Sequence, residues 1–304
     1  MKTNKYLIVV AGPTAIGKTA LGVRLAKTFG TVVLSADSRQ FFREMSIGTA
    51  KPSAEEMQGI PHYFIDSHSV AEPYNVGKYE AEAIALLEKL FSGHDVVVMA
   101  GGSGLYIDAV CKGFDELPEA DDLIRKQIDD LLEHEGIGAL QEKLKQLDPV
   151  YYAQVDLKNP QRLGRALEVC ISSGMPYSSL REGKIKTRDF NCIKIGLDTS
   201  RELLYERINN RVDKMMHEGL LEEVRSLVPF KAANALQTVG YKELFDHLEG
   251  KSSLQAAIEL IKQNTRRFAK RQLTWFRRDA GIKWFEPDET EKIIEYIKAT
   301  IDHP

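Results

Sequence analysis

Residues 12–19 read GPTAIGKT and fit the pattern G-x-x-x-x-G-K-[ST] of a phosphate-binding loop. An apolar run precedes the loop and a helical pattern follows it, which is the context that the motif requires. Glycines let the backbone N–H groups turn toward phosphate oxygens, and the helix start adds a partial positive charge. Lys18 supplies a charge for terminal phosphates, and Thr19 a hydroxyl for Mg²⁺. The loop is predicted to bind a diphosphate or polyphosphate, without indicating ATP in particular, and consists of Gly12, Pro13, Thr14, Ala15, Ile16, Gly17, Lys18 and Thr19.

A carboxylate beside this loop is the second candidate for chemistry. Enzymes with such a loop usually carry a Mg²⁺-binding aspartate at the end of a later apolar strand, but here the run 95–100 ends in two glycines. Asp37 instead follows the apolar run 31–36, at the edge of the predicted sheet where ligands bind. It can bind Mg²⁺ through water, remove a proton from a nucleophile, or cap a helix. The glycine-rich turn at 101–104 either lines the same cleft or is a simple turn.

Alternating strand and helix patterns position these residues. Continuous apolar runs predict strands at 6–11, 31–36, 63–65 and 95–100, with helices at 18–29 and 76–91. Such runs are typical of a parallel sheet covered on both faces. From 118 to about 176 the pattern is helical, with turns at Asp148-Pro149 and Asn159-Pro160. An apolar strand returns at 192–197. The rest is helical up to 283–285. We therefore expect an α/β fold with a P-loop NTPase-like core, a parallel sheet flanked by helices at 1–114 and 191–304, and a helical insertion at 115–190.

Composition excludes several classes of protein. The longest apolar runs have five or six residues, too short to span a membrane, and no signal peptide is visible. Three widely spaced cysteines support neither a disulfide framework nor a zinc site. The net charge of −3 predicts no polyanionic partner for the whole chain. However, the segment 262–278 contains seven basic and no acidic residues, and 158–189 is also net basic, so local clusters can dock a polyanion.

The motifs together resemble one family. The strings GPTAIGKT (12–19), DSRQ (37–40), IGTAKP (47–52), GGSGLY (101–106), NPQRLGRALE (159–168), QTVGYKEL (237–244) and TRRFAKRQLTWFR (265–277) occur in the order seen in tRNA dimethylallyltransferases. The resemblance spans about 8–278, and the chain is similar to the compact bacterial form. It implies transfer of a dimethylallyl group from its diphosphate to N6 of the adenosine at position 37 of tRNA, next to the anticodon.

The resemblance also implies roles for individual residues. Residues 14–19 would hold the diphosphate with Arg211, Thr19 would lie near Mg²⁺, and Asp37 would be the general base. The chain departs from the family at Ser103, where Thr is usual, and at 41–43, which read FFR where a Val-Tyr-Arg-like run is common. The residues implied to contact the tRNA are Asp37, Ser38, Arg39, Gln40, Ser103, Arg125, Gln161, Arg162, Leu163, Gly164, Arg165, Arg266 and Lys270.

The expected partners are dimethylallyl diphosphate and the tRNA anticodon loop, which the insertion would grip; the expected cofactor is Mg²⁺. We expect a monomer in the cytoplasm, with no membrane partner. Two other functions stay open on the motifs alone. One is a P-loop small-molecule kinase that uses ATP, with Asp37 as base and the insertion as a lid. The other is an RNA-binding protein gated by a nucleotide. A kinase consumes ATP, whereas a prenyltransferase releases diphosphate without it.

Overall fold

The computed structural model describes residues 4–115, 117–118, 121–181, 183 and 185–303. The chain divides into two compact units, one made of the segments up to Lys112 and from Thr187, the other of Gly113–Lys186. The predicted boundaries of the insertion, 115 and 190, lie close to these. In the described part of the chain, no helix combines the length and apolar character that crossing a membrane requires.

The first unit is built on a six-stranded parallel sheet with the order β3-β2-β4-β1-β5-β6. The central strand β1 is buried along its whole length, which explains its uninterrupted apolar sequence. The strands are β1 (Tyr6–Ala11), β2 (Val33–Ser35), β3 (His62–Tyr63), β4 (Val96–Gly101), β5 (Asn191–Leu197) and β6 (Ile282–Phe285).

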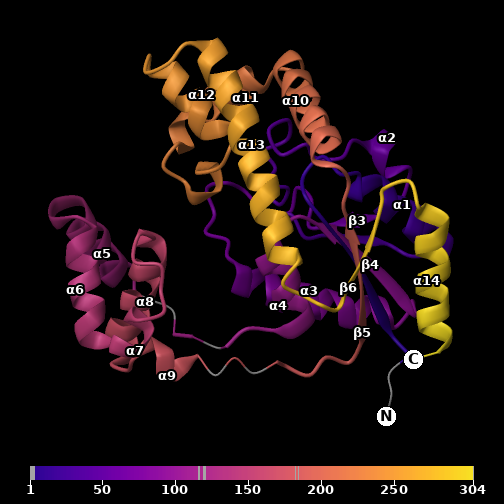
Figure 1. Cartoon of the computed structure of the whole chain (residues 1–304), viewed down its shortest axis with the longest axis horizontal. Coiled ribbons are helices and arrows are strands. Elements are labelled where there is room, and N and C mark those ends of the chain that lie inside the picture. Colours follow the sequence, from indigo (N-terminus) through magenta and orange to yellow (C-terminus); the bar gives the residue numbers. More distant parts are fainter. Residues whose placement is uncertain (1–3, 116, 119–120, 182, 184, 304) are drawn as a thin grey trace. The chain divides into compact units, whose positions relative to one another are not determined.

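Helices cover both faces of this sheet, because alternate residues of β1 join different hydrophobic clusters. Leu7 and Val9 belong to a cluster with residues of α3, α4, α11 and α12, and Ile8 and Val10 to one with residues of α1 and α14, while α10 and α13 contribute to both clusters. Figure 1 shows α1 and α14 together on one side of the sheet. The helices of this unit are α1 (Lys18–Phe29), α2 (Ala54–Met57), α3 (Val76–Phe91), α4 (Gly104–Lys112), α10 (Arg201–His217), α11 (Leu220–Ser226), α12 (Tyr241–Leu248), α13 (Leu254–Phe276) and α14 (Thr290–Asp302), with 3₁₀ turns at Val228–Phe230 and Asn234–Leu236.

The structure confirms the predicted α/β architecture, and most elements lie where the sequence placed them. β1, α1 and α3 have the predicted bounds, and β5 rejoins the sheet beside β1. The predicted strand 63–65 is wrong at both ends. β3 begins one residue earlier and ends at Tyr63. The chain turns away from the sheet after Tyr63, because Phe64 and Asp66 have left-handed backbone conformations (φ 62° and 55°).

The second unit is a small helical bundle with its own core. Its helices are α5 (Asp122–Glu135), α6 (Ile137–Leu147), α7 (Pro149–Tyr152), α8 (Pro160–Ser173) and α9 (Tyr177–Leu180). The core consists of Ile128, Leu140, Leu144, Leu163, Ala166 and Leu167. Both predicted turns lead into helices: Asp148 accepts a hydrogen bond from the Tyr151 N–H, and Asn159 accepts one from the Arg162 N–H.

Candidate active site

The phosphate loop joins β1 to α1 in the strand–loop–helix arrangement that the motif requires. Its backbone is left-handed at Gly17 (φ 105°) and also at Ala15 (φ 64°). A non-glycine residue pays about 1–3 kcal/mol for such a conformation, which persists mainly where a site needs it. The first amides of α1, before Leu21 donates to the Gly17 carbonyl, have no partner within the helix and are available to an anion.

Two cations and one carboxylate lie within each other's electrostatic field at this loop. Lys18 Nζ donates a hydrogen bond to the Pro13 carbonyl at 2.7 Å, and Arg211 Nη1 donates one to the Thr14 hydroxyl at 3.3 Å. Burial lowers the pKa of Lys18 to about 8, the negative charge of Asp37 opposes this shift, and the charge of Arg211 adds to it. Burial also lowers the pKa of Arg211, against the effect of the Asp37 and Glu56 carboxylates. The sequence-predicted Lys18, Asp37 and Arg211 are thus brought together.

Asp37 lies just beyond the end of β2 and is held by its neighbours in a tight turn. Its Oδ1 accepts a hydrogen bond from the Arg39 N–H at 3.0 Å. No other hydrogen bond to this carboxylate occurs among the described residues, so its second oxygen can accept a proton. The helix-cap alternative for Asp37 is wrong, because the next helix, α2, begins only at Ala54.

Ser103, in the glycine-rich turn after β4, contacts the same segment. Its hydroxyl accepts a hydrogen bond from the Ser38 N–H at 2.9 Å and donates one to the Ser38 hydroxyl at 3.2 Å. Its own N–H donates to the Ala36 carbonyl at 3.1 Å. The turn at 101–104 therefore fixes the backbone next to Asp37. The hydroxyl that Ser shares with the usual Thr makes these contacts.

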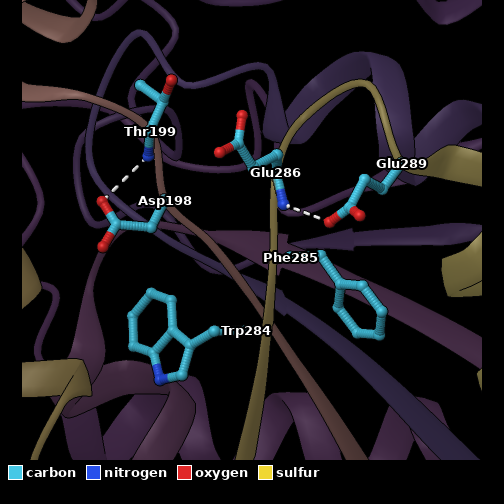
Figure 2. A pocket seen from close by; sticks show the side chains of 6 residues that line it. All are labelled: Asp198, Thr199, Trp284, Phe285, Glu286 and Glu289. Atoms are coloured by element: carbon cyan, nitrogen blue, oxygen red, sulfur yellow. Dashed lines mark hydrogen bonds between the residues drawn. The ribbon is translucent and has the colours of Figure 1, made fainter.

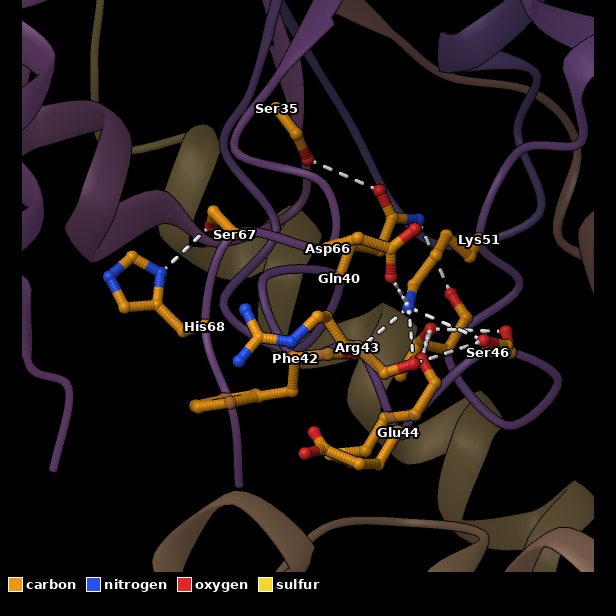
Figure 3. A network of polar contacts seen from close by, with 12 residues as sticks. Ser35, Gln40, Phe42, Arg43, Glu44, Ser46, Lys51, Asp66, Ser67 and His68 are labelled. Carbon is orange, nitrogen blue, oxygen red and sulfur yellow. Dashed lines mark hydrogen bonds and ion pairs between the residues drawn. The ribbon is translucent and has the colours of Figure 1, made fainter. Parts of the chain in front are cut away.

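Gln40 connects Asp37's segment with the IGTAKP string. Its Nε2 donates to the carbonyls of Thr49 and Ala50 at 3.3 and 3.2 Å, and its Oε1 accepts from the Ser35 hydroxyl at 3.2 Å. Lys51 continues the network, donating to the Phe42 carbonyl and pairing with Asp66 (Figure 3). The Gln40 amide, predicted to contact tRNA, here uses its donors and acceptor within the protein.

Glu223 of α11 is a site residue that the sequence analysis missed. Its carboxylate accepts hydrogen bonds from three successive backbone N–H groups, those of Ser46, Ile47 and Gly48, at 2.7–3.0 Å. It also accepts one from the Tyr241 hydroxyl at 2.6 Å, and burial together with this carboxylate raises the pKa of Tyr241. Glu223 therefore anchors the loop that holds Gln40. Tyr241 stands in the QTVGYKEL string, whereas no local pattern pointed to Glu223.

The basic helix α13 divides into a buried and an exposed face. Arg267, Lys270, Arg271 and Arg278 form an exposed stripe, hereafter the basic stripe, at helical spacing along α13 and just past its end. Arg266 differs, because it is half-buried, donates to Asn209 Oδ1 at 2.6 Å and lies over the Tyr205 ring. Of the two tRNA contacts predicted here, Lys270 is exposed and Arg266 has partners within the protein.

In the insertion, the predicted tRNA residues fall into two groups. Gln161 and Arg162 are exposed, whereas Leu163 and Gly164 are buried, Leu163 within the core of the unit. Arg125 and Arg165 both pair with Glu168, at 3.6 and 3.1 Å. The shared Glu168 carboxylate keeps both guanidinium groups beside α8, although about half of each arginine side chain stays exposed.

A surface hollow lies elsewhere on the core, away from the phosphate loop. It has a volume of about 300 Å³, lies past the ends of β5 and β6, and is lined by Asp198, Thr199, Trp284, Phe285, Glu286 and Glu289 (Figure 2). Asp198 pairs with Arg277 at 2.6 Å and Glu289 with Lys292 at 2.7 Å. None of the predicted site residues lines it, and its carboxylates disfavour a phosphorylated ligand.

A phosphate loop on a parallel sheet, with a carboxylate and two cations beside it, defines an α/β enzyme of the phosphate-loop class. Comparison with known proteins gives the family. The family described as IPP transferase matches residues 40–279. The tRNA dimethylallyltransferases of Christiangramia forsetii and Flavobacterium johnsoniae are each 54% identical to this chain; the first match covers 98% of the chain and 99% of the relative, the second 96% and 97%. This chain belongs to the IPP transferase family.

Solved structures agree with this assignment. A tRNA isopentenylpyrophosphate transferase from Bacillus halodurans is 37% identical, with a TM-score of 0.73 over 98% of this chain and 97% of its own. A eukaryotic dimethylallyltransferase, captured acting on tRNA, is 27% identical, with a TM-score of 0.77 over 93% of this chain and 74% of its own. The comparisons support the prenyltransferase hypothesis and not the kinase alternative.

Proposed function

We propose that this chain transfers the dimethylallyl group of dimethylallyl diphosphate to N6 of the adenosine at position 37 of tRNA. The observation that carries the proposal is the placement of Asp37 beside a phosphate loop that holds Lys18 and Arg211, in a member of the IPP transferase family. The same proposal has the enzyme act as a monomer in the cytoplasm, with the anticodon loop as its site on the tRNA.

In the proposed reaction, Asp37 orients and deprotonates the nucleophile. The adenine N6 amine is a poor nucleophile, because its lone pair is delocalised into the ring. A hydrogen bond to the second oxygen of Asp37 orients this amine, and the carboxylate takes its proton as the N–C bond forms. The adenine must leave the stacked anticodon loop to reach this carboxylate, as in base-flipping enzymes.

The phosphate loop binds and stabilises the leaving group. As the C–O bond of the allylic diphosphate breaks, the electron pair stays on the diphosphate, which gains negative charge. The loop amides, Lys18 and Arg211 are preorganised where this charge develops, which stabilises the transition state more than the ground state. The Thr14 hydroxyl supports this arrangement by accepting the hydrogen bond from Arg211.

The donors at the loop fit a Mg²⁺ ion bound together with the diphosphate. Thr19, in the first turn of α1, is half-buried and its hydroxyl is an oxygen donor of the kind that Mg²⁺ prefers. Among the described residues no cluster of three or more His, Cys, Asp or Glu residues could hold a metal by itself. We propose that Thr19 and the diphosphate would hold the ion together. When bound, Mg²⁺ would neutralise charge on the leaving diphosphate.

The low pKa of Lys18 makes substrate capture depend on pH. Below a pH of about 8 this amine is protonated and attracts the diphosphate; above it the free enzyme loses the charge. We expect kcat/KM for dimethylallyl diphosphate to fall as the pH rises through about 8. A Lys18→Arg variant, which stays protonated, should show no such fall, whatever its absolute rate. A wild-type profile that stays level to pH 10 would contradict the assignment.

ATP should be neither required nor turned over. Purified enzyme with dimethylallyl diphosphate, Mg²⁺ and unmodified tRNA should release inorganic diphosphate at the same rate with and without ATP. We expect this because β4 ends at Gly101, so the Mg²⁺-binding carboxylate that such ATP-using enzymes usually carry at a strand end is absent there. Formation of ADP in step with turnover would overturn the proposal and favour the kinase hypothesis.

The basic stripe is proposed to bind the tRNA backbone. Replacing Lys270, Arg271 and Arg278 with Gln should weaken tRNA binding and flatten the plot of log affinity against log salt, because each lost contact to a single-stranded phosphate removes about 0.7 from the slope. The modified base should not change. A matched variant with Lys283, Lys292 and Lys298 changed to Gln alters the net charge equally on other exposed positions. Equal slopes for the two variants would show that RNA binds elsewhere.

A further inference from the structure

The two central strands separate where the phosphate loop begins, and one side chain fills the gap. β1 and β4 pair in parallel register as far as Ala11 and Gly101. Beyond that point Gln272 of α13 lies between the two segments that follow β1 and β4. Its Oε1 accepts a hydrogen bond from the Thr14 N–H at 2.9 Å, and its Nε2 donates one to the Gly102 carbonyl at 2.9 Å. The carboxamide therefore continues the hydrogen-bond ladder of the sheet past the strand ends.

The surroundings are shaped to admit this side chain. Gln272 is only 6% exposed, so both of its hydrogen bonds are shielded from water. A Cβ added to Gly102 would lie 2.3 Å from Gln272 Nε2, so any larger residue at position 102 would collide with the carboxamide. A Cβ added to Gly104 would meet the Trp275 ring at 2.3 Å. Two glycines of the turn at 101–104 thus make room for α13.

The last turn of α13 is anchored, which fixes the position of Gln272. Trp275 Nε1 donates a hydrogen bond to Asp108 of α4 at 2.9 Å. Just beyond the helix, Asp279 pairs with Lys194 at 2.7 Å and with Lys112 at 3.1 Å, and these two ammonium groups lower the pKa of the Asp279 carboxyl to about 2. These contacts attach the helix end to α4 and β5, so Gln272 is a rigid support for the loop.

We propose that Gln272 is a positioning residue of the diphosphate site. Because Gln272 accepts the hydrogen bond of the Thr14 N–H, this amide is not among the donors that face the diphosphate. The same hydrogen bond fixes the backbone at the start of the loop. The fixed Thr14 then presents its hydroxyl to Arg211, and the amides from Ala15 to Thr19 are left to bind the anion. The inference rests on the proposed function only in that this loop binds a diphosphate.

A calorimetric titration with inorganic diphosphate and Mg²⁺ tests this role on the full chain. Gln272→Met keeps the length of the side chain and removes both hydrogen bonds. We expect it to weaken diphosphate binding on the order of tenfold or more, to raise KM for dimethylallyl diphosphate by a similar factor, and to leave tRNA affinity unchanged. Gln263→Met, at an exposed position of the same helix, is the matched control and should behave as wild type.

Diphosphate affinity equal in the two Met variants would overturn the inference, and so would failure of the wild-type enzyme to bind inorganic diphosphate. If the wild type binds diphosphate and only Gln272→Met weakens it, the inference stands even where no prenylated adenosine forms, which would count against the proposed function alone.

A second variant keeps the test decisive if Gln272→Met does not fold. In Gln272→Glu the neutral carboxylic acid can accept and donate as the amide does, whereas the carboxylate only accepts and also repels the diphosphate. Its diphosphate affinity relative to wild type at the same pH should therefore recover as the pH falls. A ratio that does not change with pH would overturn the positioning role.

Discussion

Replacing Asp37 with Asn should lower the rate of prenyl transfer by about 10²–10⁴ at saturating substrates, the usual cost of losing a general base. Asn keeps the shape of the side chain and can still accept the Arg39 N–H, so the turn beyond β2 should stay intact. What it loses is the negative oxygen that takes the proton from N6. The affinities for tRNA and for diphosphate should change little.

Single-turnover rates with unmodified tRNA measure this effect, because they separate chemistry from product release. Asp288→Asn, an exposed carboxylate before α14, is the matched control and should retain the wild-type rate. If Asp37→Asn turned over within a few-fold of wild type, Asp37 would not be the base.

Replacing Lys18 with Met should lower kcat/KM for dimethylallyl diphosphate by about 10²–10³, comparable to the removal of one donor from an oxyanion site. The Lys18 amine lies in the electrostatic field of Asp37 and Arg211, and its burial lowers its pKa. Part of the loss should appear in kcat, because the charge on the diphosphate increases in the transition state.

Lys27→Met on the same helix provides the comparison. Lys27 is exposed and donates a hydrogen bond to the Gln58 side chain, so its loss should leave both kinetic constants nearly unchanged. A variant at position 18 that changed only tRNA affinity would refute the role of this lysine in leaving-group stabilisation.

The fold was largely predictable because its signals are local. Buried parallel strands such as β1 must be apolar at every position, and the phosphate loop requires a strand before it and a helix after it. The edge strand β3 was placed less well, because it has only two residues, both paired with β2, and left-handed backbone conformations at Phe64 and Asp66 decide where it ends.

The parts of the site that the sequence did not predict depend on contacts between distant segments. Glu223 binds a loop about 175 residues earlier in the chain, and Gln272 binds Thr14 across 258 residues. Neither stands in a periodic pattern that marks it out. Within the basic segment, composition alone could not separate the exposed Lys270 from Arg266, which Asn209 and Tyr205 hold.

The most direct test of the account is nucleoside and fragment mass analysis of unmodified tRNA incubated with the purified enzyme, dimethylallyl diphosphate and Mg²⁺, without ATP. The account predicts a mass increase of one dimethylallyl group, confined to the anticodon-loop fragment and located on N6 of the adenosine at position 37. Asp37→Asn should form this product at least about a hundredfold more slowly than wild type. Unmodified tRNA, or the group on another base, would contradict it.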